Sequence, residues 1–156
     1  MQEKDSLLLI EKIENKILYI RGHKVMIDYD LAFLYEIETK QLKRQVKRNI
    51  DRFPEDFMFE LTKEEHEVLR SQFGTLKRGA HAKYLPMVFT EQGVAMLSSV
   101  LSSDRAIKVN IEIMRAFTRL RKMISSYKDL VKKVEDMEKK YDENFAMVFE
   151  ALKQLI

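Results

Sequence analysis

The sequence predicts an α+β fold: a mostly helical domain with short strands, followed by a separate C-terminal helix. Apolar residues make up 46% of the chain and charged residues 34%, a balance typical of a helix-rich protein with a real core. The last third holds no proline or glycine and is dense in Lys and Glu. We therefore divide the chain into an N-terminal segment 1–16, a domain at 17–124 and a coiled-coil helix at 127–156.

The first half of the domain is expected to hold a hairpin and two short helices. Residues 7–18 form a short helix, and Ile17–Arg21 and Lys24–Ile27 flank a tight turn typical of a β-hairpin. Asp28 is the expected N-cap of a helix that runs to Tyr35. Thr39 is the expected N-cap of a second helix, which runs to Arg48.

The second half alternates further strands and helices. Residues 57–61 alternate as in a strand, and Thr62 and Glu65 have capping-box spacing at the start of a helix that runs to Phe73. Residues 74–83 hold two glycines and no periodicity, which predicts a flexible loop. Residues 84–89 form a strand kinked at Pro86, a position that suits a sheet edge.

Two more helices complete the domain. Thr90 caps the first, which runs to Leu101, and Ser102 or Ser103 caps the second. The core-facing stripe of the second helix is predicted from helical spacing to be Ile107, Ile111, Met114, Phe117 and Leu120.

The C-terminal third has apolar residues in steps of three and four, with a stutter at Tyr141. They are Tyr127, Leu130, Val134, Met137, Tyr141, Phe145, Val148, Leu152 and Leu155. So narrow a stripe favours a helix–helix seam, so we expect a homodimer or higher homo-oligomer. We place the boundary at Ser125-Ser126, although one helix running through it also fits.

Composition excludes several classes of function. The chain has no cysteine, and His23, His66 and His81 are scattered, so we expect no metal site. There is no phosphate-binding glycine loop or nucleophile elbow, so we expect no cofactor, no catalytic residue and no enzyme activity. No apolar run approaches the ~20 residues of a membrane span, and the N-terminus lacks a cationic leader; we expect a cytoplasmic protein.

Positive charge is concentrated, although the net charge is only +3. Residues 40–52 hold six Lys and Arg residues, with Asp51 as the single acid. We predict a helix-turn-helix at 28–48, and most of these cations lie on its second helix. Ala32 lets the two helices approach closely. The apolar positions that lock them together are Leu31, Leu34, Tyr35, Ile37, Leu42 and Val46. Two positions depart from the usual motif. The turn has Glu36 where glycine is usual. The last apolar core residue, Val46, comes one position later than the usual spacing, which falls on Gln45.

The outer face of the second helix carries the candidate DNA contacts. They are Thr39, Lys40, Gln41, Lys43, Arg44, Lys47 and Arg48. Arg suits guanine and Gln suits adenine in the major groove, so we assign Gln41, Arg44 and Lys40 to base edges. Lys43, Lys47 and Arg48 are assigned to phosphates. The alternative is a basic helix that merely faces solvent.

Two further basic segments leave alternatives open. In the 74–83 loop, Lys77, Arg78 and Lys83 form either a wing that contacts phosphates or a solvated loop. The helix at 103–122 carries cations that either extend a positive surface or face solvent beside a packed stripe. These are Arg105, Lys108, Arg115, Arg119, Arg121 and Lys122.

Several sequence blocks resemble the KilA-N superfamily, and most closely its "ORF six N-terminal" domain. The blocks are Ile20–Met26, Asp30–Ala32, Gln45–Asn49, Arg52–Phe59, Leu61–Glu65, Phe89–Leu97 and Asn110–Phe117, in this order. The resemblance implies a phage or prophage DNA-binding protein with double-stranded DNA as its partner, active as a transcriptional regulator or antirepressor. The alternative that it leaves open is an antirepressor that binds another regulator protein without reading DNA.

Overall fold

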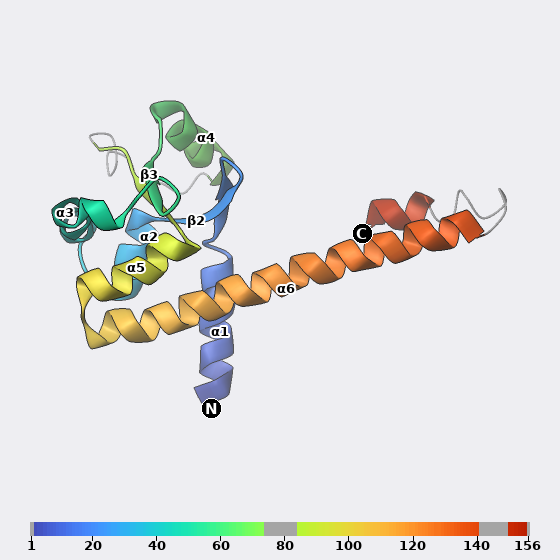
Figure 1. Cartoon of the computed structure of the whole chain (residues 1–156), viewed down its shortest axis with the longest axis horizontal. Coiled ribbons are helices and arrows are strands. Elements are labelled where there is room, and N and C mark those ends of the chain that lie inside the picture. Colours follow the sequence, from blue (N-terminus) through green and yellow to red (C-terminus); the bar gives the residue numbers. More distant parts are fainter. Residues whose placement is uncertain (1, 74–83, 141–149, 156) are drawn as a thin grey trace. The chain divides into compact units, whose positions relative to one another are not determined.

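The computed structural model describes residues 2–73, 84–140 and 150–155 and confirms the α+β class (Figure 1). The chain divides into two units, Met1–Ala116 and Phe117–Ile156, which are described separately. The elements in order are α1 (Gln2–Glu14), β1 (Leu18–Ile20), β2 (His23–Ile27), α2 (Asp28–Tyr35), α3 (Thr39–Arg48), the 3-10 helix η1 (Ile50–Arg52), β3 (Met58–Glu60), α4 (Lys63–Phe73), β4 (Met87–Thr90), α5 (Glu91–Leu101) and α6 (Asp104–Lys140).

The first unit is built on a four-stranded antiparallel sheet in the order β1-β2-β4-β3. β4 therefore lies in the interior, and the edge position predicted from Pro86 is wrong. The proline is tolerated because it precedes the first strand residue, so its missing N–H removes no ladder bond. Its carbonyl oxygen instead accepts a hydrogen bond from the Leu61 N–H at 3.0 Å.

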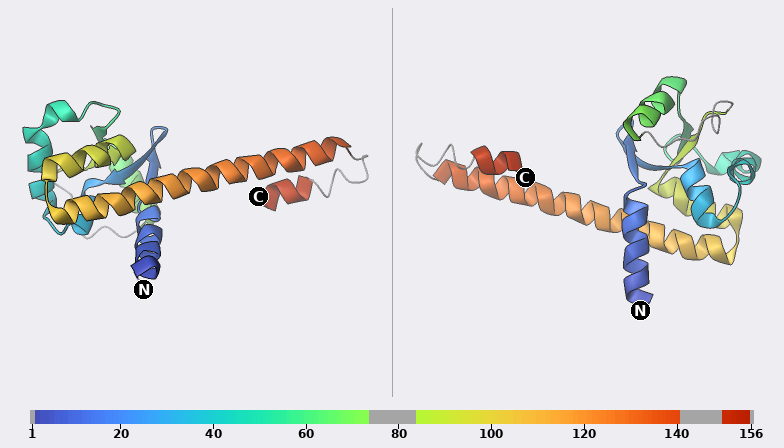
Figure 2. Two further views of the ribbon diagram at one scale, coloured as in Figure 1. Left: turned by 60° about the horizontal axis from the view of Figure 1, so that its bottom comes forward. Right: turned by 180° about the vertical axis from the view of Figure 1, so that it is seen from behind.

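The central strands β2 and β4 are buried on both faces. Val25, Ile27 and Val88 belong to one buried cluster. Phe59 of β3 and Leu69 of α4 pack against it. Because side chains alternate along a strand, Met26 and Phe89 point to the opposite face, where α2 and α5 pack against the sheet. α3 packs in turn on α2 and α5, and Figure 2 shows these three helices together beside the sheet from two further sides.

The predicted hairpin is confirmed, and its turn contacts β3 and α4. Arg21 and Gly22 have φ of 53° and 79°, as a two-residue type I′ turn requires. The Arg21 guanidinium lies 4.5 Å from the centroid of the Phe59 ring. It donates two hydrogen bonds to the Glu65 carboxylate, at 2.7 and 2.8 Å. The Thr62–Glu65 capping box is also confirmed, with reciprocal bonds of 2.8 and 3.1 Å.

Of the other predicted helix caps, two are confirmed and two are wrong. Thr90 accepts a hydrogen bond from the Gly93 N–H, and Ser103 accepts one from the Ala106 N–H. Asp28 and Thr39 do not cap, since each is the first residue inside its helix and neither cap position uses a side chain. Burial decides the Asp28 case, because its carboxylate is directed to the interior, where it accepts a hydrogen bond from the Met87 N–H at 2.9 Å.

The start of α5 passes unusually close to another part of the backbone. A Cβ atom on Gly93 would lie 1.9 Å from the Phe57 carbonyl oxygen, far inside van der Waals contact. The same oxygen accepts a hydrogen bond from the Thr90 N–H at 3.0 Å. Glycine at position 93 is therefore required by space and not by backbone conformation.

The predicted core stripe of α6 is partly wrong. Ile107 and Ile111 are 47% and 46% exposed, whereas Phe117 of the predicted stripe is fully buried. Within the first unit the helix instead buries a neighbouring face. That face consists of Ala106, Val109, Asn110, Ile113 and Ala116. Asn110 is its polar member: its amide donates to the Val94 carbonyl at 2.8 Å, and its side-chain oxygen accepts from the Tyr35 hydroxyl. This pair of bonds joins α2, α5 and α6.

The second unit contains the rest of α6, which continues without a break through Ser125 and Ser126, and a helical segment at 150–155. Lys153 forms ion pairs with Glu138 at 2.8 Å and Glu150 at 3.1 Å. Of the predicted seam, Tyr127, Leu130, Met137, Leu152 and Leu155 are exposed and Val134 is buried. Tyr141, Phe145 and Val148 lie outside the described residues, and the coiled coil stays a prediction.

Candidate nucleic-acid interface

α2 and α3 form a compact helical pair joined by the three residues 36–38. Glu36 has φ 60° and ψ 43°, in the left-handed region that ordinarily favours glycine. The turn closes with a hydrogen bond from the Ile37 N–H to the Ala32 carbonyl at 3.0 Å. Ala32 is buried, as its predicted role between the helices requires. Glu36 thus adopts the left-handed conformation that glycine usually supplies at this position of the motif.

One face of α3 is anchored in the domain. Leu42 and Val46 are completely buried, against α2 and α5. Four residues apart, they lie above one another on the helix and so fix its rotation about its own axis. Whatever lies on the opposite face must point away from the domain.

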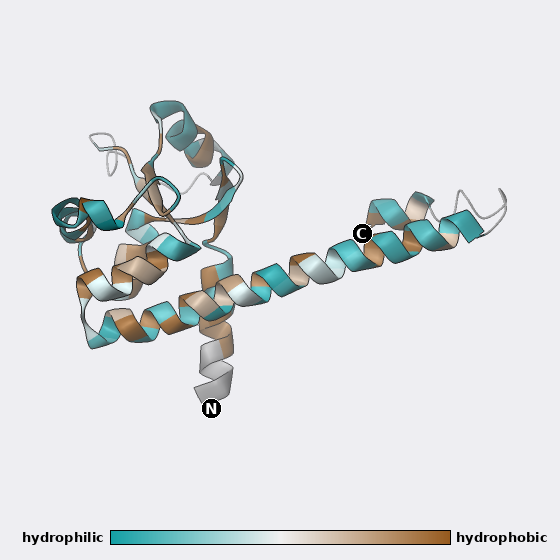
Figure 3. Cartoon of the chain, viewed as in Figure 1, coloured by the Kyte–Doolittle hydropathy of each residue, from teal (hydrophilic) through white to brown (hydrophobic). Residues whose placement is uncertain are grey.

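That opposite face carries the predicted contact residues, and no acidic residue interrupts it. The exposed members are Lys40, Gln41, Arg44, Lys47 and Arg48, while Thr39 is half-buried. In Figure 3, α3 is coloured mostly as hydrophilic. Lys47 and Arg48 lie in the last turn, where the negative end of the helix dipole favours cations. The structure therefore brings five of the seven predicted residues onto one exposed surface, which we call the α3 face.

Lys43 is different, because its side chain is directed into the domain and is only 18% exposed. Its ammonium donates a hydrogen bond to the Leu85 carbonyl at 2.7 Å and lies 3.4 Å from the Asp28 carboxylate. The Tyr84 ring lies 6.0 Å from the same ammonium. Sequence spacing gave no sign of this, because all three partners are distant in the sequence. Tyr84 and Leu85 follow Lys43 by about forty positions, and Asp28 precedes it by fifteen. Lys43 thus connects α3 to α2 and to the segment just before β4.

The buried Asp28 carboxylate is the other half of this link. Burial raises its pKa, and the Met87 N–H and the Lys43 ammonium oppose that rise because they stabilise the ionised form. Such a pair is poorly placed to bind a nucleic acid. Its geometry instead suits holding α3 in one position on the domain.

Other predicted cations are distributed as follows. Lys77, Arg78 and Lys83 lie outside the described residues. On α6, Arg105 donates to the Leu34 carbonyl at 3.1 Å, and Arg115 pairs with Glu112 at 2.7 Å. Both side chains are exposed as well as bonded within the protein, with 52% of the Arg105 and 59% of the Arg115 side-chain surface accessible.

Within the described ranges, no three His, Cys, Asp or Glu side chains lie together in a way that could hold a metal ion. Over the same ranges, no helix combines the length and apolar character needed to cross a membrane.

The fold and the α3 face together define an α+β domain that displays a short basic helix on its surface. The chain belongs to the ORF6N domain family, whose model matches residues 15–100, and this confirms the resemblance seen in the sequence. The match extends from just before β1 into the last turn of α5, so it includes the whole sheet and the α3 face. Membership fits a regulator of phage type. Searches of curated proteins and of solved structures find no match.

Proposed function

We propose that this protein binds double-stranded DNA by placing α3 in the major groove. One observation carries the proposal: α3 buries Leu42 and Val46 completely and exposes only polar and basic side chains on its other face. A recognition helix needs this division, because the anchored face fixes its angle while the exposed face reaches bases.

The exposed residues divide by chemistry into two groups. Gln41, Arg44 and Lys40 contact base edges in this proposal, with the Arg bidentate to guanine and the Gln bidentate to adenine. Lys47 and Arg48 contact phosphates, which position the helix without reading sequence. We omit Lys43 from the phosphate contacts because its ammonium is held by Leu85 and Asp28. For Lys77, Arg78 and Lys83, which lie outside the described residues, a phosphate-binding wing and a solvated loop both stay open.

The biological role that we propose is a non-catalytic transcriptional regulator or antirepressor in the cytoplasm. We further propose that residues 127–156 pair two such domains. The exposed apolar residues Tyr127, Leu130 and Met137 support this, since an unpaired helix has no reason to repeat them at seam spacing. Two linked domains raise the effective concentration of the second DNA contact.

The test is DNA binding by the purified full-length protein over a series of salt concentrations, after selection of bound sequences from a random pool. Each phosphate contact contributes about 0.9 to the slope of log K against log salt concentration. Lys47→Gln should therefore lower that slope by about one contact, and Arg44→Ala should relax sequence preference at a cost of about 1–3 kcal/mol. Lys63→Gln, in the exposed first turn of α4, is the matched control and should change neither quantity.

Lys43→Gln separates positioning from contact. We expect it to weaken binding while leaving the slope unchanged, because the ammonium that it removes contacts Leu85 and Asp28. A slope lowered as much as in Lys47→Gln would return Lys43 to the phosphate contacts. Absence of any DNA binding at low salt would reject the proposal and favour the rival, a regulator that acts only through protein–protein contact.

A further inference from the structure

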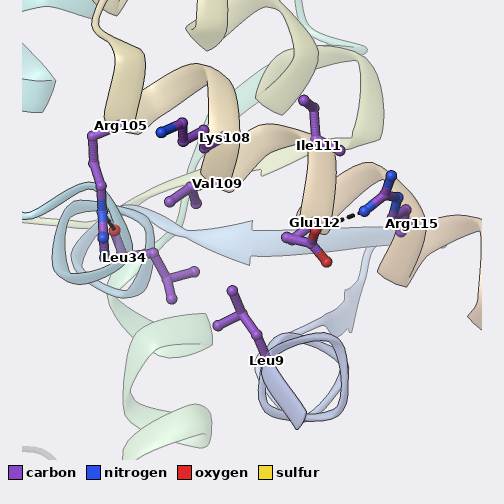
Figure 4. Close-up of a pocket in the computed structure, with 8 residues that line it drawn as sticks. All are labelled: Leu9, Leu34, Arg105, Lys108, Val109, Ile111, Glu112 and Arg115. Atoms are coloured by element: carbon purple, nitrogen blue, oxygen red, sulfur yellow. Dashed lines mark hydrogen bonds and ion pairs between the residues drawn. The ribbon is translucent and has the colours of Figure 1, made fainter. Parts of the chain in front are cut away.

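An apolar groove opens on the first unit between α1, α2 and the first turns of α6 (Figure 4). Its volume is about 410 Å³, and its apolar lining consists of Leu9, Leu34, Val109 and Ile111. Ile111 is nearly half exposed, as is Ile107 one turn before it. No residue of the α3 face lines the groove, so it has no role in the proposed DNA contact.

The rim of the groove is mainly cationic. Arg105, Lys108 and Arg115 line it, with Glu112 as the single acid. Glu112 is paired with Arg115, as the dashed line in Figure 4 marks. Arg105 likewise lies 3.6 Å from the Glu36 carboxylate. The three cations and these two acids leave a net charge of +1, so an occupant with apolar side chains and a net negative charge would fit the groove.

α1 has this combination. Leu7, Leu8, Leu9 and Ile10 are consecutive, and because successive helical residues lie about 100° apart, they present apolar surface all around the helix. The domain covers only part of it: Ile13 is fully buried, whereas Leu7 and Leu8 are 47% and 49% exposed. Residues 2–14 hold four acidic and two basic residues, so the helix is net negative.

We propose that the groove binds α1 of a second copy of this chain. The contact would be isologous, since each copy offers both an α1 helix and a groove. It would bury Leu7 and Leu8 of one copy against Ile111 and its neighbours of the other, and it would place an acidic helix against a cationic rim. One contact thus accounts for two exposed apolar features of the same unit. The proposal does not depend on DNA binding or on the seam at 127–156.

Site-directed cross-linking tests it, because the natural chain has no cysteine to confuse the result. Leu8→Cys and Ile111→Cys are made in separate, differently tagged full-length chains, which are mixed and oxidised. Both positions are about half exposed, so the fold should tolerate the changes, and circular dichroism checks this. The control pair is Leu8→Cys with Lys63→Cys, because α4 does not line the groove.

We expect the Leu8–Ile111 pair to yield at least roughly tenfold more cross-linked heterodimer than the control pair, as an effective concentration set by docking requires. Equal yields would overturn the proposal. A further mixture of two tagged Tyr127→Cys chains identifies the other assembly. Cross-linking there without any between Leu8 and Ile111 would mean that the copies associate through the C-terminal helix alone, and would also overturn it.

Discussion

Replacing Tyr35 with Phe removes one hydroxyl group from the contact that joins α2, α5 and α6. Burial raises the pKa of Tyr35, so its hydroxyl stays protonated and donates to the Asn110 side-chain oxygen. Asn110 is only 5% exposed, so water cannot readily replace that donor. An acceptor left unpaired in the interior costs about 1–3 kcal/mol. In a chain of this size each kcal/mol lowers the melting temperature by about 2–4 °C.

The assay is urea denaturation followed by circular dichroism, with Tyr19→Phe as the control. Tyr19 is 74% exposed, so loss of its hydroxyl should change the free energy of unfolding very little. The double variant Tyr35→Phe, Asn110→Ala should be destabilised by less than the sum of the single variants, because both remove the same hydrogen bond. Equal stability of Tyr35→Phe and Tyr19→Phe would refute the reasoning.

Three further predictions concern backbone and charge. Gly93→Ala should lose more than about 4 kcal/mol of stability because the new methyl group meets the Phe57 carbonyl oxygen. The control Gly22→Ala should lose far less, because its methyl group meets no atom within 4 Å. Similar melting temperatures of the two variants would contradict this. Glu36→Gly should gain roughly 0.5–1 kcal/mol in urea denaturation by relieving a left-handed residue, and a loss would show that the turn is not strained. The Arg21 hydrogen bonds lower the pKa of Glu65 to about 2, so the stability they contribute is present above the ordinary value of 4.5 and lost as pH falls toward 2. The difference in urea midpoint between the natural protein and Glu65→Gln should therefore shrink over that range, and a constant difference would reject the pairing.

Local signals in the sequence predicted the elements well. The Arg21-Gly22 turn, the Thr62–Glu65 capping box and the Thr90 cap each depend on residues within three positions of one another, and all three are confirmed. The exposed α3 face also followed from helical spacing alone.

What the sequence could not predict depends on contacts between distant segments. Pro86 indicated an edge strand, but β4 lies between β2 and β3. A proline just before a strand removes no ladder bond and so permits this interior position. Ile107 and Ile111 have stronger apolar character than Ala106, yet Ala106 is buried and the two isoleucines are about half exposed. Helical spacing alone did not reveal which face of α6 meets the domain. Lys43 gave no sign of its inward direction, since only the folded chain brings Leu85 and Asp28 to it.

The link between Lys43 and Asp28 also bears on the entropy of binding by α3. Because this pair and the buried Leu42 and Val46 hold the helix in place, its backbone is ordered before any ligand arrives. A ligand of the α3 face would then need to immobilise only the long exposed side chains, at about 0.5–1.5 kcal/mol each. The helix is in this sense preorganised, and affinity should depend on how many of Lys40, Arg44, Lys47 and Arg48 a target engages at once.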